Sequence, residues 1–354
     1  MSGRRADPCA RRFAVTRDGW ALELFCHSPA GGDEPRRATP VLLVPGYAQT
    51  PYLFGVHPRG PSLLATLLAA GFETWTLYLR GTGQSRPRRD DAGPVSLVAY
   101  ADEDLPAALE VVLEDREAAS GRAFVIGSSL GGSVVYGYLA RSGAARIAGV
   151  VALGSPLRWE PPHPILRALF ASPRLAARAP MGGASRLASS TFPWLGRAGW
   201  LAPYVNPAHV DLEDARTLVG AVTDPNPTIN AEIATWVARR ELVLAGTDVA
   251  AALRRITIPL LVVAANRDGL VPPAAARSAA EAWGGSDREV LEVGTREDWF
   301  AHADLFVAPT APLRVFAPVA RWLAARDPGS PALAARGPGA PDLAVRPAGD
   351  RPGA

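Results

Sequence analysis

The sequence of 354 residues contains no lysine, so all 37 of its basic side chains are arginines. This absence excludes chemistry that needs a lysine amine, such as Schiff-base catalysis and attachment of pyridoxal phosphate. It also excludes a Walker A loop and a protein-kinase site in standard form, because both use a lysine to contact phosphates. Five histidines are left as the obvious bases at neutral pH: His27, His57, His163, His209 and His302.

Cysteine is scarce as well. Cys9 and Cys26 cannot form a disulfide framework or a zinc site. Residues 1–17 contain no apolar segment of the kind found in secretory signals, and we therefore expect a cytoplasmic protein. Five arginines and one aspartate give residues 1–17 a charge of +4, which leaves −1 for the rest of the net +3. Because most of the chain is close to neutral, the sequence offers no basic face for nucleic acid.

Short apolar runs alternate with helical patterns through residues 13–154 and 256–326. Such regular alternation is typical of an α/β protein whose mostly parallel sheet is covered by helices on both faces. Residues 155–255 interrupt this pattern and are rich in proline and large aromatic side chains. An interruption this long favours a helical cap over the carboxyl edge of the sheet, where α/β proteins bind ligands.

Both ends of the chain differ in composition from the predicted core. Residues 1–12 are predicted to be a flexible basic arm. Residues 327–354 contain six prolines and five glycines without apolar periodicity, which predicts a disordered tail.

The strongest local motif is Gly127-Ser128-Ser129-Leu130-Gly131, which fits G-x-S-x-G between an apolar strand and a helix. The turn in this motif is so tight that side chains at Gly127 and Gly131 would collide with their surroundings. Ser129 is therefore predicted to be a nucleophile whose hydroxyl lies above the sheet, at a helix N-terminus. Ser128 is the neighbouring candidate, but its position lacks flanking glycines.

The same motif explains residues 123–140, an uncharged run whose length approaches that of a membrane span. Glycines and serines interrupt the run, and a buried strand, a turn and a buried helix account for it. No integral membrane span is predicted.

His302 is the predicted base, because it follows the last strand in the chain order serine, acid, histidine. His57 is the second choice. Asp268 follows the strand at residues 260–265 and is predicted to orient His302, although an aspartate in an Asp-Gly turn can also be purely structural. Asp304 lies too close to His302 in the chain for this role, and Asp248 precedes the strand.

Acyl transfer also needs two donors for the oxyanion. The backbone amide of Leu130 is one predicted donor, and that of Tyr47, just after the apolar run at residues 41–44, is the other. Within the predicted cap, Trp159, Trp194 and Trp200 are candidates for a hydrophobic substrate pocket, with packing inside the cap as the alternative.

Residues 13–325 resemble the α/β-hydrolase superfamily. The resemblance rests on Val-Pro-Gly-Tyr at residues 44–47, Leu-Arg-Gly-Thr-Gly-Gln-Ser at 79–85, the serine motif, Asn-Arg-Asp at 266–268, and His302. It implies a structural role for Arg80. The motifs at residues 44–47 and 302–306 are similar to the lipase-like branch, which includes polyhydroxyalkanoate synthases. Members commonly carry His-Gly where this chain has Pro45-Gly46, and the synthases carry cysteine where it has Ser129.

We therefore expect a serine hydrolase that cleaves a carboxylic ester of a hydrophobic acyl or aromatic substrate through an acyl-enzyme, without metal or cofactor. An acyltransferase or thioesterase with the same triad is one alternative. A non-catalytic binding protein with this fold is the other, since fold alone does not fix function.

Overall fold

The computed structural model describes residues 10–29, 36–114, 121–159, 202–209 and 221–328, together with residues 164, 167, 170 and 172–178. The predictions for Trp194, Trp200, most of the flexible arm, most of the tail and much of the cap lie outside the described residues.

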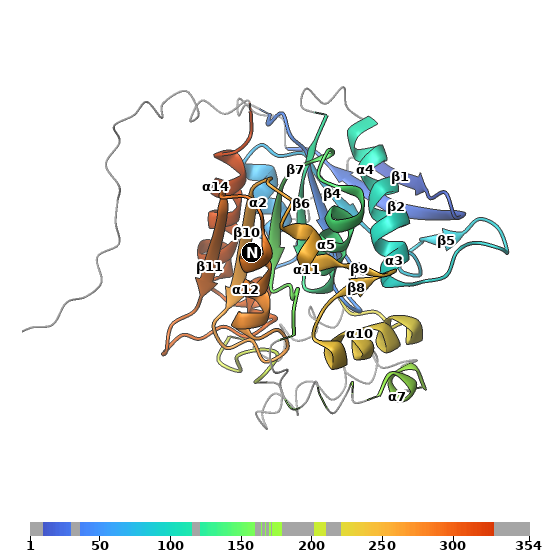
Figure 1. Ribbon diagram of the computed structural model, residues 1–354. Helices are drawn as coiled ribbons and strands as arrows, with labels where there is room; N and C mark the ends of the chain where they lie inside the picture. The colour runs from blue at the N-terminus through green and yellow to red at the C-terminus, as the bar shows by residue number, and fades with distance from the viewer. Residues whose placement is uncertain are drawn as a thin grey trace, which may run out of the picture.

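A mostly parallel sheet forms the centre of the protein, in the strand order β1-β2-β4-β3-β6-β7-β10-β11 (Figure 1). Its strands are β1 (Ala10–Val15), β2 (Trp20–His27), β3 (Val41–Val44), β4 (Thr74–Leu77), β6 (Ala123–Ser128), β7 (Ile147–Leu153), β10 (Leu260–Ala265) and β11 (Arg288–Val293), with the short β5 (Arg86–Pro87) beside β2. The pairs β1–β2 and β2–β4 are antiparallel, and every pair from β4 to β11 is parallel. The predicted α/β class is confirmed.

Helices cover both faces of this sheet (Figure 1). One side carries α3 (Leu97–Ala99), a π-helical turn η1 (Tyr100–Asp104), α4 (Leu105–Glu114), α5 (Leu130–Ser142), α11 (Val249–Leu253) and α12 (Pro273–Ala282). The other carries α1 (Tyr52–Gly55), α2 (Leu63–Ala69), α13 (Asp304–Val307), a second π-helical turn η2 (Pro312–Phe316) and α14 (Ala317–Ala324). None of the described helices is long and apolar enough to span a membrane.

The central strands β3, β7 and β10 are apolar throughout because both of their faces are buried. In β3, Leu42 and Val44 pack into the first helical layer, whereas Val41 and Leu43 pack into the second. All four side chains are fully buried. This is the pattern of a parallel strand between two layers, where alternate side chains point to opposite faces.

The boundaries predicted from the sequence differ from the structure at both ends. Residues 10–12 lie in the predicted arm 1–12 but form the start of β1 and pair with β2. Asp327 lies in the predicted tail but is buried and accepts hydrogen bonds from the amides of Ala38 and Thr39. Partners distant in sequence order these residues, and local composition does not reveal such partners.

The predicted cap contains α7 (Pro173–Arg178) and α10 (Pro227–Arg239), which pack together below the carboxyl ends of the strands (Figure 1). The hairpin β8 (Val243–Leu244) and β9 (Thr247–Asp248) was also placed in the cap from sequence, as was α11. The structure instead places them against α5 of the core, where Leu244 lies beside Gly137.

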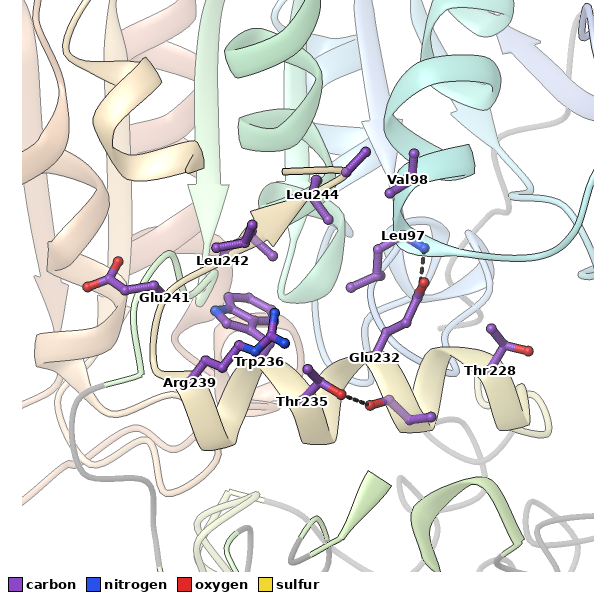
Figure 2. Close-up of a pocket in the computed structure, with 13 residues that line it drawn as sticks. Leu97, Val98, Thr228, Glu232, Thr235, Trp236, Arg239, Glu241, Leu242 and Leu244 are labelled. Carbon is purple, nitrogen blue, oxygen red and sulfur yellow. Dashed lines mark hydrogen bonds between the residues drawn. The ribbon is translucent and has the colours of Figure 1, made fainter. Parts of the chain in front are cut away.

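A cavity of about 290 Å³ lies between α10, the start of α3 and the β8–β9 hairpin (Figure 2). Trp236, Leu242 and Leu244 line it, and Glu232 on α10 accepts a hydrogen bond of 2.7 Å from the Leu97 amide. This bond anchors the cap helix to the core.

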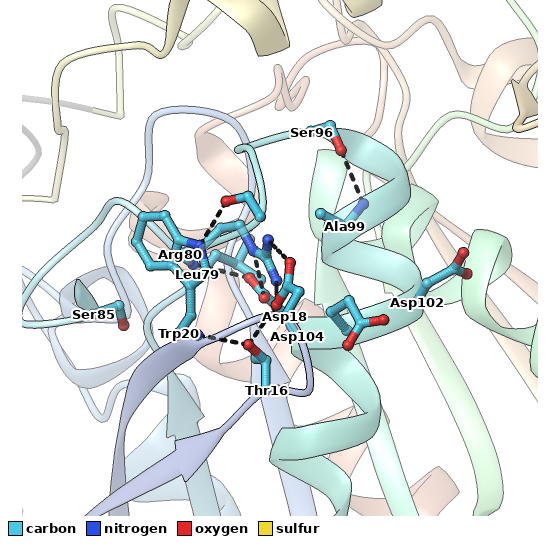
Figure 3. A network of polar contacts seen from close by, with 12 residues as sticks. Thr16, Asp18, Trp20, Leu79, Arg80, Ser85, Ser96, Ala99, Asp102 and Asp104 are labelled. Atoms are coloured by element: carbon cyan, nitrogen blue, oxygen red, sulfur yellow. Dashed lines mark hydrogen bonds and ion pairs between the residues drawn. The ribbon is translucent and has the colours of Figure 1, made fainter. Parts of the chain in front are cut away.

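Arg80, which follows β4, is fully buried at the centre of a polar network (Figure 3). Its Nε donates to Asp104 Oδ1 at 2.7 Å, and its two terminal nitrogens donate to Asp18 at 2.6 and 3.0 Å. The guanidinium also lies 5.4 Å from the Trp20 ring centroid. Burial raises the pKa of Asp104 to about 6, although Arg80 opposes the shift. The network joins the β1–β2 turn, the end of β4 and η1.

Replacing Arg80 with methionine is expected to lower the free energy of unfolding by about 3–5 kcal/mol, because Asp104 loses its cation in a buried site. Urea denaturation followed by circular dichroism measures the loss. Arg17→Gln is the matched control, since Arg17 pairs with Glu103 at the surface and its loss should cost less than about 1 kcal/mol. Equal losses in the two variants would contradict a structural role for Arg80.

Candidate active site

Ser129 occupies the turn between β6 and α5 in a backbone conformation rarely adopted by residues with a side chain, with φ 51° and ψ −121°. The flanking glycines make this possible. A Cβ at Gly127 would lie 2.4 Å from the backbone of Gly132, and one at Gly131 would lie 2.3 Å from the carbonyl oxygen of Val44. The backbones of the turn and of its neighbours are therefore in direct contact, and this contact holds the backbone of Ser129 in a strained conformation.

His302 and Asp268 lie together at the carboxyl edge of the sheet. His302 Nδ1 donates to Asp268 Oδ2 at 2.6 Å, and both side chains are buried. The other oxygen of Asp268 accepts from the amides of Leu270 and Val271 at 2.9 and 2.7 Å. Asp268 thus combines the two roles weighed from sequence, because one oxygen fixes its own turn and the other meets the imidazole.

Ser129 and His302 approach the same point of the sheet edge, at the end of β7. The Ser129 amide donates to the Leu153 carbonyl at 2.8 Å. The next residue, Gly154, has φ 56°, and a Cβ there would lie 3.2 Å from His302 Cε1. Gly154 therefore lies next to both the serine turn and the imidazole, and it adds no side chain there.

The turn after β3 lies against Ser129. A Cβ at Gly46 would lie 2.9 Å from Ser129 Cβ, so this turn approaches the serine as closely as glycine allows. Gln49 Oε1 accepts from the Gly46 amide at 3.0 Å and from the Ser128 hydroxyl at 3.1 Å. Sequence reasoning missed Gln49, since nothing in the local pattern separates it from an ordinary turn residue.

Tyr47 and Leu130, the predicted donors, line one small cavity beside this turn together with Tyr100 and Ile229. Leu130 is the first residue of α5, where amide groups lack an acceptor within the helix. The Tyr47 hydroxyl donates to Asn230 on α10, and burial raises the pKa of this phenol to about 12. The Tyr47 side chain thus links the turn to the cap helix.

Two of the remaining candidates lie away from this point. Trp159 is buried, and its ring lies 5.4 Å from that of Trp236 on α10. This residue therefore packs against the cap helix. His57 bonds the Ala308 carbonyl at 3.0 Å and lies edge-on to Phe316, on the side of the sheet that carries α13 and η2. It is therefore placed with the helical layer, not with Ser129.

Residues 202–209 pack over the acid and the base. The Gly269 amide, next to Asp268, donates to the Pro203 carbonyl at 2.9 Å. The Tyr204 ring lies 6.3 Å from the His302 ring. Sequence reasoning placed this segment in the cap but could not show which part of the core it covers.

Three solved structures share this fold at low sequence identity. Esterase RhEst1 from Rhodococcus sp. ECU1013 has a TM-score of 0.59 and 22% identity, with 88% of this chain and 98% of that chain covered. A thermophilic esterase from Thermogutta terrifontis has a TM-score of 0.58 and 20% identity, covering 90% and 100%. A soluble variant of monoglyceride lipase from Saccharomyces cerevisiae has a TM-score of 0.60 and 16% identity, covering 92% and 97%.

No curated protein matches the sequence. A family model described as serine aminopeptidase, S33, matches residues 57–293, which include the serine turn and Asp268 and end before His302. Together with the sheet order and the strained serine turn, this match shows that the chain belongs to the serine aminopeptidase S33 family of the α/β-hydrolase superfamily.

Proposed function

We propose that this protein is a serine hydrolase that cleaves carboxylic esters through an acyl-enzyme. Ser129 attacks the ester carbonyl, His302 accepts the serine proton and passes it to the leaving alcohol, and Asp268 holds the imidazole. One observation carries the proposal: a strained serine turn and a buried aspartate–histidine pair of 2.6 Å meet at Gly154. Membership of the family supports the hydrolase class.

The amides of Tyr47 and Leu130 are the proposed donors to the oxyanion. Both residues border one cavity beside Ser129. The two loops are held against each other, because Gly46 lies against Ser129 and Gly131 lies against the carbonyl oxygen of Val44. Preorganised backbone donors of this kind stabilise the tetrahedral intermediate without rearrangement during the reaction.

The proposed substrate has a hydrophobic acyl or aromatic group. Leu79, Tyr100 and Ile229 contribute apolar surface to the cavity beside the oxyanion donors. Two of the proteins with the same fold are an esterase and a monoglyceride lipase, which supports an ester substrate. The matching family is described as an aminopeptidase, so the experiment must also test an amide substrate.

Ser129→Ala is expected to lower kcat for p-nitrophenyl esters by at least about 10³-fold, and His302→Ala similarly, because triad members act as a unit. A series of graded acyl lengths, run beside aminoacyl p-nitroanilides, separates esterase from peptidase activity. Labelling by a fluorophosphonate probe reports the nucleophile directly.

Ser142→Ala is the control for this experiment, since Ser142 lies exposed at the far end of α5. It should label as the wild type does. Loss of labelling in Ser128→Ala, with labelling retained in Ser129→Ala, would show that the nucleophile is assigned wrongly.

Asp268→Asn is expected to reduce kcat by about 10³–10⁴-fold with little loss of stability. Asparagine can keep the oxygen that accepts from Leu270 and Val271, but its NH2 group then faces His302. An NH2 group donates and cannot accept the hydrogen bond of His302 Nδ1. Asp268→Ala removes both functions, so it should also lower the thermal unfolding midpoint. A wild-type kcat in Asp268→Asn would show that Asp268 only stabilises its own turn and does not assist His302.

A further inference from the structure

His209, in the covering segment 202–209, forms a second histidine–aspartate cluster with Asp298, on the loop that carries His302, and with Asp304 of α13. Its Nε2 donates to Asp298 Oδ1 at 2.6 Å, and its Nδ1 lies 3.1 Å from Asp304 Oδ1, an ion-pair contact. The ring packs edge-on to Phe300 with centroids 5.3 Å apart, and the side chain is buried. The function proposed above makes no use of this cluster.

Asp304 connects His209 to the backbone around His302. It is fully buried at the start of α13, and its Oδ2 accepts from the amides of Ala301 and Asn206 at 2.7 and 2.8 Å. Ala301 immediately precedes His302. This carboxylate therefore joins the approach to His302 with the covering segment 202–209.

The residue after His302 is held by the same segment. The Ala303 amide donates to the Tyr204 carbonyl at 2.8 Å, and the Asn206 side chain donates to the Trp299 carbonyl at 2.8 Å. Ala303 is thus held directly by residues 202–209, and Ala301 is held through Asp304, which also bonds Asn206. A shift of about 1 Å in a reacting group can cost about 10²-fold in rate, so contacts that fix the backbone around His302 also affect the rate of proton transfer.

The geometry also sets the charge of His209. Nε2 donates to Asp298, whereas Nδ1 and Asp304 Oδ1 lie at ion-pair distance without a well-aligned hydrogen bond. A carboxylate beside each ring nitrogen favours the imidazolium over the neutral ring. Among the described residues, the other charged group at this cluster is Arg314, 3.2 Å from Asp298. No group of three side chains in the described parts has the arrangement of a metal site.

The pKa of His209 agrees with this assignment. Burial lowers the pKa, but the contacts with Asp304 and Asp298 outweigh burial and raise it above its ordinary value. Burial raises the pKa of Asp304, which its contacts with His209 and two amides partly offset.

We propose that His209 is a positioning residue, which as a cation bridges Asp304 and Asp298 and thereby holds the loop of His302 in place to accept the proton of Ser129. This role rests on the proposed hydrolase function. Because the pKa of His209 is raised in the folded protein, the support is fully present below the ordinary pKa of an imidazole and is lost as pH rises through the raised pKa. kcat should then fall on the alkaline side.

The kinetic test is His209→Gln, which keeps one hydrogen-bond donor and removes the charge. With p-nitrophenyl esters we expect kcat to fall about 10-fold with KM nearly unchanged, and the alkaline fall in kcat to disappear. His57→Gln is the matched control, since His57 bonds the Ala308 carbonyl on another part of the fold. It should keep the wild-type kcat and pH profile. A folded His209→Gln variant with the wild-type kcat and pH profile would overturn the proposal.

A second measurement does not depend on activity. Five histidines give few imidazole signals, so proton NMR can follow the titration of His209 in the full chain. We expect a midpoint above 6.5 in the wild type, and a lower one in Asp304→Asn and in Asp298→Asn. A midpoint unchanged in both variants overturns the bridge. If the wild type hydrolyses no ester or amide, the proposed function fails, and the titration still decides whether His209 is the bridging cation.

Discussion

The contact of backbone with backbone at the β6–α5 turn is the constraint on which the site depends. Gly127 lies against Gly132, and Gly131 lies against the carbonyl of Val44, without room for a side chain. This packing holds Ser129 in a conformation that costs a residue with a side chain about 1–3 kcal/mol. Because the contact also joins β3 to the start of α5, it brings the turn after β3 beside the serine.

The sequence was sufficient to predict what depends on local pattern. Apolar runs and the glycine spacing indicated the parallel sheet and the turn of Ser129, and chain order singled out Asp268 and His302. It was not sufficient for contacts between distant segments. Gln49 meets Ser128 across 79 positions, and Asn206 meets Asp304 across 98, and neither pairing leaves a local signal. The start of β1 was missed for the same reason.

Two histidine–aspartate clusters meet at the loop after β11, and their surroundings differ. The ring of His302 meets one carboxylate, at Nδ1, and packs on Gly154 beside the serine turn. The ring of His209 meets a carboxylate at each nitrogen, which leaves no nitrogen to accept a proton. In the function proposed above, His209 serves as a fixed cation and His302 exchanges the proton of Ser129.

In the described parts of the chain, the ion pairs all use arginine or histidine as the cation, since lysine is absent. A guanidinium keeps its proton at any pH at which a protein stays folded, so pairs such as Arg80–Asp104 and Arg326–Asp287 do not lose their cation in mild alkali. The charge of the arginine side chains therefore stays constant between pH 6 and 9, roughly the range where histidines titrate. In that range the response to pH comes mainly from a few imidazoles, together with the buried Asp104, whose pKa is raised to about 6.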